Sequence, residues 1–139
     1  MSDVNDLGDP RAELLDVARA AKERAHCPYS NYSVGAAIRA ASGEIYAGCN
    51  VENAAYPEGT CAEAGAIAAM VLAGDHVIAE VAVVTGGATP GTPCGGCRQR
   101  LREFAASDVL VHAANGTGMS LTVSMEDLLP NSFGPGNLA

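Results

Sequence analysis

Residues 60–97 read TCAEAGAIAAMVLAGDHVIAEVAVVTGGATPGTPCGGC, and this stretch contains the clearest indication of the fold class. Residues 61–72 are rich in alanine and Gly74 is a good C-cap, so a buried helix is predicted here. Residues 77–85 are apolar and β-branched, which predicts a strand, and a second helix is expected to begin near Cys94. The order helix, strand, helix is typical of an α/β domain.

The segments on either side extend this pattern. Pro10 follows Asp9 and suits the first position of a helix predicted over about 10–25. The remaining elements are a β-hairpin at 34–50, strands at 108–113 and 120–125, and a helical turn at 126–130. We therefore expect a sheet with helices on both faces, in which the hairpin adds an antiparallel edge to otherwise parallel strands. One domain is expected over 1–139, with flexible tails at about 1–9 and 134–139.

The composition restricts the possible partners. With 139 residues, of which 48% are hydrophobic, the chain can bury a core, but its formal net charge is −8 and no basic residue follows position 102. A nucleic-acid partner is therefore not expected, and a small uncharged ligand is favoured. The opening MSDVNDLGD resembles no signal peptide, and no apolar run is long enough to span a membrane. These features predict a cytoplasmic protein without a membrane partner.

Three of the five cysteines are spaced like metal ligands. Cys61, Cys94 and Cys97 fall at the predicted starts of two helices, where backbone N–H groups stabilise thiolates. Three protein ligands leave the fourth position of a tetrahedral zinc ion free for water, as in catalytic sites. The alternative is that Cys94 and Cys97 form a redox pair or half of a structural four-cysteine site, with Cys61 simply buried. Cys27 and Cys49 lack ligand spacing and are interpreted as structural.

Glu63 is the candidate catalytic residue. It lies two residues beyond Cys61, so its carboxylate can approach a zinc-bound water without binding the metal, and can accept a proton from that water. The simpler alternative is that Glu63 only complements the dipole of the helix it begins. The combination of Cys-x-Glu with a later Pro-Cys-x-x-Cys matches the signature of zinc deaminases and favours the catalytic interpretation.

Four motifs resemble those of the small, homotetrameric, three-cysteine cytidine deaminases. They are PYSNYSVGAAI (28–38), GCNVENAAYPEGTCAE (48–63), TPCGGCRQRLREF (92–104) and DLLPNSF (127–133). The resemblance implies a three-layer α/β/α sandwich around a mixed five-stranded sheet, a homotetramer, and one zinc ion per chain. It also implies hydrolytic deamination of cytidine and 2′-deoxycytidine to uridine and 2′-deoxyuridine with release of ammonia, a hydrolase reaction of pyrimidine salvage.

The same resemblance implies a set of substrate contacts. Asn50 and Glu52 would bind the ribose hydroxyls, and the backbone of Ala62 would contact the cytosine ring. Tyr32 occupies the place of an aromatic that packs on the substrate, and Phe133 matches an aromatic that enters a neighbouring subunit's site. Without the resemblance, Asn50 and Glu52 would be interpreted as a turn after a strand, and the two aromatics as core residues.

One position departs from the family pattern. Many members carry an arginine directly after the catalytic glutamate, where it hydrogen-bonds the thiolate ligands, but this chain has Ala64. Three thiolates and a zinc ion carry a net charge of −1, which the helix N-termini offset in part. Whether Arg98 or another arginine supplies the missing cation is left open by the sequence.

Two other functions are considered. A deaminase of another nucleoside-like molecule, such as the antibiotic blasticidin S, would have a similar metal motif, but the intact GCNVEN at 48–53 argues against it. A zinc-stabilised binding module without catalysis would need a fourth protein ligand and would give Glu63 no role.

Overall fold

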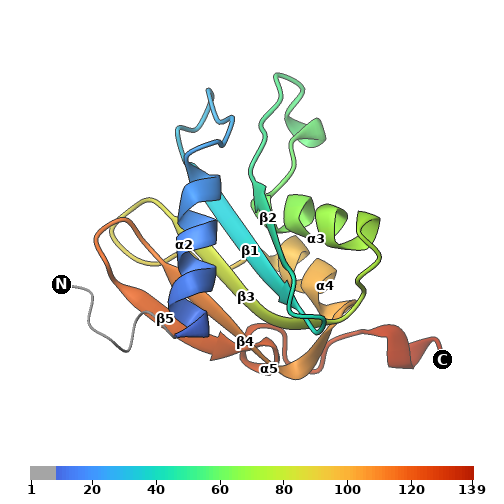
Figure 1. The fold of residues 1–139 in the computed structure, drawn as a ribbon. Coiled ribbons are helices and arrows are strands. Elements are labelled where there is room, and N and C mark those ends of the chain that lie inside the picture. The colour runs from blue at the N-terminus through green and yellow to red at the C-terminus, as the bar shows by residue number, and fades with distance from the viewer. Residues whose placement is uncertain (1–8) are drawn as a thin grey trace.

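The computed structural model describes residues 9–139, which fold around a single five-stranded sheet (Figure 1). The strands are β1 (Val34–Ala40), β2 (Ile45–Cys49), β3 (Ile78–Thr85), β4 (Ala105–Ala114) and β5 (Ser120–Ser124). The α-helices are α2 (Pro10–Lys22), α3 (Ala62–Leu72), α4 (Gly95–Arg102) and α5 (Met125–Leu128), with 3₁₀ turns at Tyr56–Glu58 and Pro135–Asn137. None of the helices between residues 9 and 139 has the length and apolar character needed to cross a membrane.

The strand order in the sheet is β2-β1-β3-β4-β5. Only β3 and β4 pair in parallel, and the other three pairs are antiparallel. The expectation of otherwise parallel strands was therefore wrong. The α3 crossover does connect two strands of the same direction, β2 and β3, but β1 lies between them and pairs with both in the opposite direction. On the other side, β5 follows β4 after a short connection and can only return antiparallel.

Helices cover both faces of the sheet, which confirms the predicted three-layer α/β/α arrangement around a mixed sheet (Figure 1). Because side chains alternate along a strand, neighbouring residues of β1 enter different cores. Ile38 packs in the larger core with Met70 of α3 and Leu101 of α4, whereas Ala37 packs against Leu14 of α2.

The boundaries of three elements differ from the predicted ones. The first helix ends at Lys22 rather than near 25, because Arg24 and Ala25 bond in tight turns to the carbonyls of Ala21 and Lys22. β4 begins at Ala105, three residues before the expected start at 108. Met125 belongs to α5 and not to the last strand, because the Ser124 side chain caps that helix.

The structure describes only part of the two tails that the sequence predicts. Of the tail predicted at 1–9, residues 1–8 lie outside the described part of the chain, and Asp9 caps α2 by accepting a hydrogen bond from the backbone N–H of Arg11. The other tail, 134–139, contains the 3₁₀ turn at Pro135–Asn137, and its flexibility stays a prediction.

The start of α3 is held against β2 by a close approach of two backbones. A Cβ atom at Gly48 would lie only 2.3 Å from the carbonyl oxygen of Ala62 and 2.4 Å from the backbone nitrogen of Ala66. Only glycine permits this contact, since a real side chain would have to push the helix away. Gly48 therefore fixes the position of the helix end that carries Cys61.

Candidate metal centre and active site

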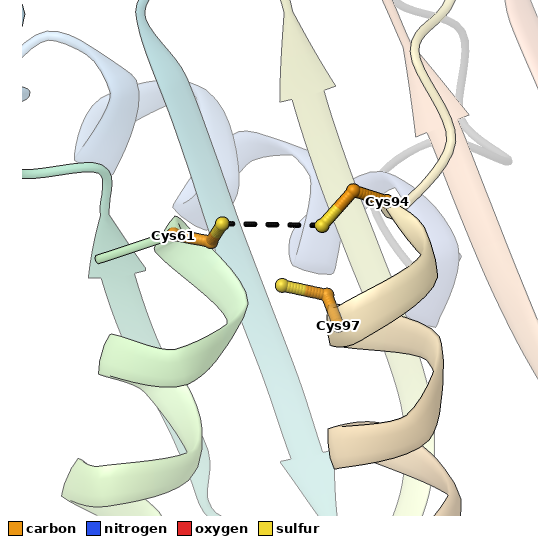
Figure 2. Close-up of side chains that lie close together, drawn as sticks. All are labelled: Cys61, Cys94 and Cys97. Atoms are coloured by element: carbon orange, nitrogen blue, oxygen red, sulfur yellow. Dashed lines mark hydrogen bonds between the residues drawn. The ribbon is translucent and has the colours of Figure 1, made fainter. Parts of the chain in front are cut away.

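The candidate metal ligands lie at the N-termini of two helices on the same face of the sheet. Cys61 is the N-cap of α3, and Cys94 is the N-cap of α4. Neither side chain caps its own helix by a hydrogen bond, so both sulfurs are free to point elsewhere. Cys97, in the first turn of α4, directs its sulfur to the same point (Figure 2).

The spacing of the three sulfurs fits one zinc ion. All three lie within 4.8 Å of one another, and the Sγ atoms of Cys61 and Cys94 are 4.0 Å apart (Figure 2). Thiolates bound to a tetrahedral zinc at the usual bond length are separated by about 3.8 Å. Among residues 9–139 these three cysteines are the group of cysteine, histidine or acidic side chains with metal-binding geometry. They leave the fourth position of a tetrahedral ion to a non-protein ligand.

The electrostatics of the three thiols differ with their surroundings. The backbone amide of Cys97, in the first turn of α4, favours the thiolate form of Cys94 and lowers the pKa of that thiol. Burial raises the pKa of Cys61 and of Cys97, and neighbouring acidic groups add to the shift in both. Two of the three sulfurs therefore hold their protons tightly unless a cation is present, and metal binding must displace those protons.

Glu63 lies next to the sulfurs and is almost completely buried. It is the second residue of α3 and is only 4% exposed. Burial raises the pKa of its carboxyl, while its own backbone N–H, Cys97 and the positive charge of Arg100 act in the opposite direction. A raised pKa makes the carboxylate a stronger base, which favours the acceptance and return of a proton by a general acid and base.

A cavity of about 340 Å³ opens onto these groups. Its lining includes the sequence-predicted residues Tyr32, Asn50, Glu52, Cys61, Ala62, Glu63 and Cys94. Thr60, Val83, Thr85 and Thr92 also line it and were not singled out from the sequence. Threonine and valine in strands and loops carry no local signal of a binding role, so only the tertiary structure identifies them.

The site agrees with the comparisons to known proteins. Residues 9–113 match the family model of the cytidine and deoxycytidylate deaminase zinc-binding region. The chain belongs to this deaminase family. A cytidine deaminase of Sporosarcina psychrophila is 38% identical over 127 residues, which cover 91% of this chain and 93% of that protein. A cytidine deaminase of Halalkalibacterium halodurans is 36% identical over 123 residues, covering 88% and 93%.

Solved structures of the deaminase family have the same fold. The crystal structure of cytidine deaminase from Burkholderia pseudomallei superposes with a TM-score of 0.86 at 39% identity, covering 90% of this chain and all of that one. Cytidine deaminase from Mycobacterium tuberculosis gives a TM-score of 0.79 at 34% identity, covering 91% and 98%. The mixed five-stranded sheet is thus the sheet of the deaminase family, as the motifs implied.

Asn50 and Glu52 hold the loop that forms one wall of the deaminase cavity. Glu52 Oε1 accepts hydrogen bonds from the backbone N–H groups of Tyr29 and Ser30, and Oε2 accepts from the Ser30 hydroxyl at 2.6 Å. These bonds, the hydroxyl first, lower the pKa of Glu52. Asn50 accepts from the N–H of Val34 and donates to the carbonyl of Tyr32. Both side chains therefore line the cavity and stabilise its wall.

The aromatic residues are divided between two places. Tyr32 lines the cavity and is 44% exposed, and Tyr56 lines it while packing edge-on against Tyr29 with ring centroids 5.7 Å apart. Phe133 does not enter this chain's cavity. It lies beside α4, where its carbonyl accepts a hydrogen bond from Gln99, and its side chain is 56% exposed.

Position 64 is an alanine, and the structure shows which arginine elsewhere in the chain contacts a candidate metal ligand. The Arg98 guanidinium donates to the carbonyls of Pro93 and Leu128 and to the hydroxyl of Thr92. Its hydrogen bonds therefore join the start of α4 to α5, and none of them goes to a sulfur. Arg100 donates to Cys97 Sγ, with Nη1 at 3.6 Å.

Proposed function

We propose that this chain catalyses the hydrolytic deamination of cytidine and 2′-deoxycytidine at the Cys61, Glu63, Cys94 and Cys97 site, as a single catalytic domain. One observation carries the proposal: a three-sulfur metal cluster and a buried carboxyl with a raised pKa meet in a cavity large enough for a nucleoside. Cytidine deaminase relatives that match most of the chain support the substrate class.

The thiolates would hold a zinc ion, which when bound lowers the pKa of a water molecule toward neutrality. Glu63 then accepts a proton from the attacking water and delivers it to ring N3 of the cytosine. The water oxygen forms a bond to C4, Glu63 then moves the proton of the resulting C4 hydroxyl to the exocyclic amine, and the C4–N bond breaks as the C4 carbonyl forms. Ammonia leaves, and uridine or 2′-deoxyuridine remains.

The wall of the cavity supplies the recognition of the nucleoside. The backbone of Ala62 lies between Cys61 and Glu63, where it can bond the edge of the cytosine. Asn50 and Glu52 would bind the ribose hydroxyls with the hydrogen-bonding capacity that the loop leaves free, since a carboxylate oxygen has two lone pairs and an amide has two N–H donors. Tyr32 would pack against the substrate from the same wall.

The proposed working form is a homotetramer in which Phe133 completes a neighbour's site. Its support is the half-exposed Phe133 ring, which lies outside its own chain's cavity at the end of the DLLPNSF motif. Phe133→Ala would then raise KM for cytidine more than it lowers kcat, and analytical ultracentrifugation would show whether four chains associate. We place this enzyme in the cytoplasm, a compartment that suits five free cysteines.

The proposed reaction is tested with purified zinc-loaded protein and cytidine, by following the ultraviolet change as uridine forms and by measuring ammonia. Glu63→Ala should lower kcat by about 10³-fold or more while zinc content stays near one per chain. Glu126→Ala is the matched control, because Glu126 is an exposed acid in the first turn of a helix and can only complement a dipole. An inactive wild type with full zinc would contradict the proposal.

A further inference from the structure

The zinc centre needs a counter-charge that its ligands do not provide. Three thiolates and one divalent ion leave a net charge of −1, and Glu63 places another acidic group beside them. Cys97 is buried, so water does not solvate that charge fully. The N-termini of α3 and α4 offset part of it, because the positive end of each helix dipole lies at the cysteine that begins the helix. A nearby cation would offset the rest.

Arg100 has the geometry to provide this cation. Its side chain runs back along α4 toward the start of the helix, as long helical side chains do, and places Nη1 3.6 Å from Cys97 Sγ. Gly96 lies one turn before it on the same helix face. A Cβ at Gly96 would lie 3.3 Å from Nη1, so the missing side chain leaves the space that the guanidinium uses.

A simpler role for Arg100 would be to complement the C-terminal end of the helix dipole, since it lies in the last turn of α4. Its guanidinium, however, is folded toward the N-terminal end, where the dipole repels a cation, so an attractive group must hold it there. Arg102 in the same turn behaves differently, because it donates to the Ser132 hydroxyl and the Ala105 carbonyl. The contact with a sulfur therefore distinguishes Arg100 from its neighbour.

We propose that Arg100 is a positioning residue of the zinc centre, which orients the Cys97 thiolate by a hydrogen bond and offsets the net negative charge of the metal-bound site. This inference rests on the proposed zinc function. It assigns to α4 the task that an arginine at position 64 would otherwise perform. Arg100 contacts no substrate group in this arrangement and acts only through Cys97.

Zinc affinity is the first test. Wild type, Arg100→Gln, Arg100→Lys and Arg102→Gln are each titrated with zinc against a chromophoric chelator at neutral pH. Replacing the thiol protons with one divalent ion makes the site more negative, so loss of the guanidinium should weaken binding, by about 10- to 100-fold in Arg100→Gln. Arg100→Lys keeps the charge and should lose less, whereas Arg102→Gln should bind zinc like the wild type.

A spectroscopic test separates a contact with the sulfur from a general loss of stability. In the cobalt-substituted proteins, the thiolate-to-cobalt charge-transfer band should move to longer wavelength in Arg100→Gln, because a sulfur without its hydrogen bond gives up an electron more easily. The band should move less in Arg100→Lys, which also serves as the test variant if the glutamine variant does not fold. Arg102→Gln should leave it in place.

The outcomes separate this inference from the proposed function. A wild type that binds no zinc would overturn the proposed function itself. A wild type that binds one zinc per chain, together with Arg100 variants whose affinity and cobalt band equal those of the wild type, would overturn only the role of Arg100.

Discussion

Two clusters of ionisable side chains lie on opposite faces of the sheet, and they differ in the signs of their charges. The α2 face carries the charged cluster, which consists of Arg39, Glu80 and His112. Glu80 bonds His112 Nε2 through one carboxylate oxygen, and its other oxygen lies 3.5 Å from Arg39 Nε. The opposite face carries the acidic cluster, which consists of Cys61, Glu63, Cys94 and Cys97.

The two clusters differ in whether the chain itself supplies both signs of charge. In the charged cluster, cationic and anionic groups lie within ion-pair distance, although Arg39 Nε makes no hydrogen bond, and His112 Nδ1 pairs with the Thr122 hydroxyl at 2.8 Å. Because both signs of charge are present, this cluster needs no ion from outside the chain. The acidic cluster contains only groups that become negative on losing a proton, so it is completed by a cation from outside the chain. That incompleteness is the property expected of a metal-binding site.

The largest effect is expected from removing a ligand in the acidic cluster. Cys97→Ser should abolish zinc retention through purification and with it nearly all deamination, because one of three protein ligands is lost. Cys49→Ser is the matched control, since Cys49 lies outside the cluster, and it should keep one zinc per chain. Metal analysis beside the cytidine assay measures both. Full zinc and activity in Cys97→Ser would remove the distinction between the two clusters.

The charged cluster should show the opposite behaviour. Glu80→Gln leaves the buried His112 without its carboxylate partner and leaves Arg39 with Glu13 as its remaining anion, so we expect about 2–3 kcal/mol less stability toward urea and a Tm lower by about 5–10 °C. Deamination at low temperature should be unchanged, because this cluster lies on the other side of the sheet.

Glu44→Gln, which changes an exposed acid in the turn before β2, is the control for Glu80→Gln and should change stability little. A large fall in kcat in folded Glu80→Gln protein would contradict the assignment of the charged cluster to structure alone.

A smaller effect is expected for Glu63→Gln in metal-free protein, where the substitution should raise the free energy of unfolding instead of lowering it. Burial raises the pKa of Glu63, so the folded state binds that proton more tightly than the unfolded state does. The wild type therefore gains stability as pH falls through the folded pKa, and at higher pH a buried carboxylate weakens it. Glu63→Gln should accordingly be more stable than the wild type at about pH 8, and the difference should shrink toward about pH 5. Urea unfolding at both values tests this, and a variant less stable at the higher pH would contradict it.

Much of the acidic cluster and of the secondary structure could be predicted from the sequence. The ligands and Glu63 are identified by local spacing, since Cys-x-Glu and Cys-x-x-Cys lie at predicted helix starts. The helices and strands follow from periodicity and from capping residues such as Gly74. The sheet order does not, because nothing in a strand's own residues states that β1 lies between β2 and β3.

The remaining features depend on contacts distant in sequence. Arg98 and Arg100 both follow Cys97 on α4, and the sequence does not show which of them contacts a sulfur. Only the packing of α5 shows that Arg98 bonds the Leu128 carbonyl, whereas Arg100 contacts Cys97. The charged cluster was also missed, since His112 stood outside every motif and its partner Glu80 lies on the adjacent strand. A lone histidine in a strand carries no signal of such a partner.

The smallest effect is expected at a third polar contact, which lies near the surface instead of inside the protein. The Tyr46 hydroxyl donates to Asp75, and this bond lowers the pKa of Asp75 and raises that of Tyr46 to about 12.

The lowered pKa of Asp75 stabilises the fold at pH values above the unfolded pKa of about 4, and this stabilisation is lost as pH falls through the folded pKa. The tyrosine contribution is present below about pH 10 and is lost only as pH rises through its raised pKa. Asp75→Asn should therefore be slightly less stable than the wild type at neutral pH, with a smaller difference at about pH 3, while the exposed Asp108→Asn shows neither effect. Urea unfolding curves at the two pH values test this prediction. An equal difference in stability at both pH values would contradict it, because Asp75 would then contribute through packing or neutral hydrogen bonds and not through its charge.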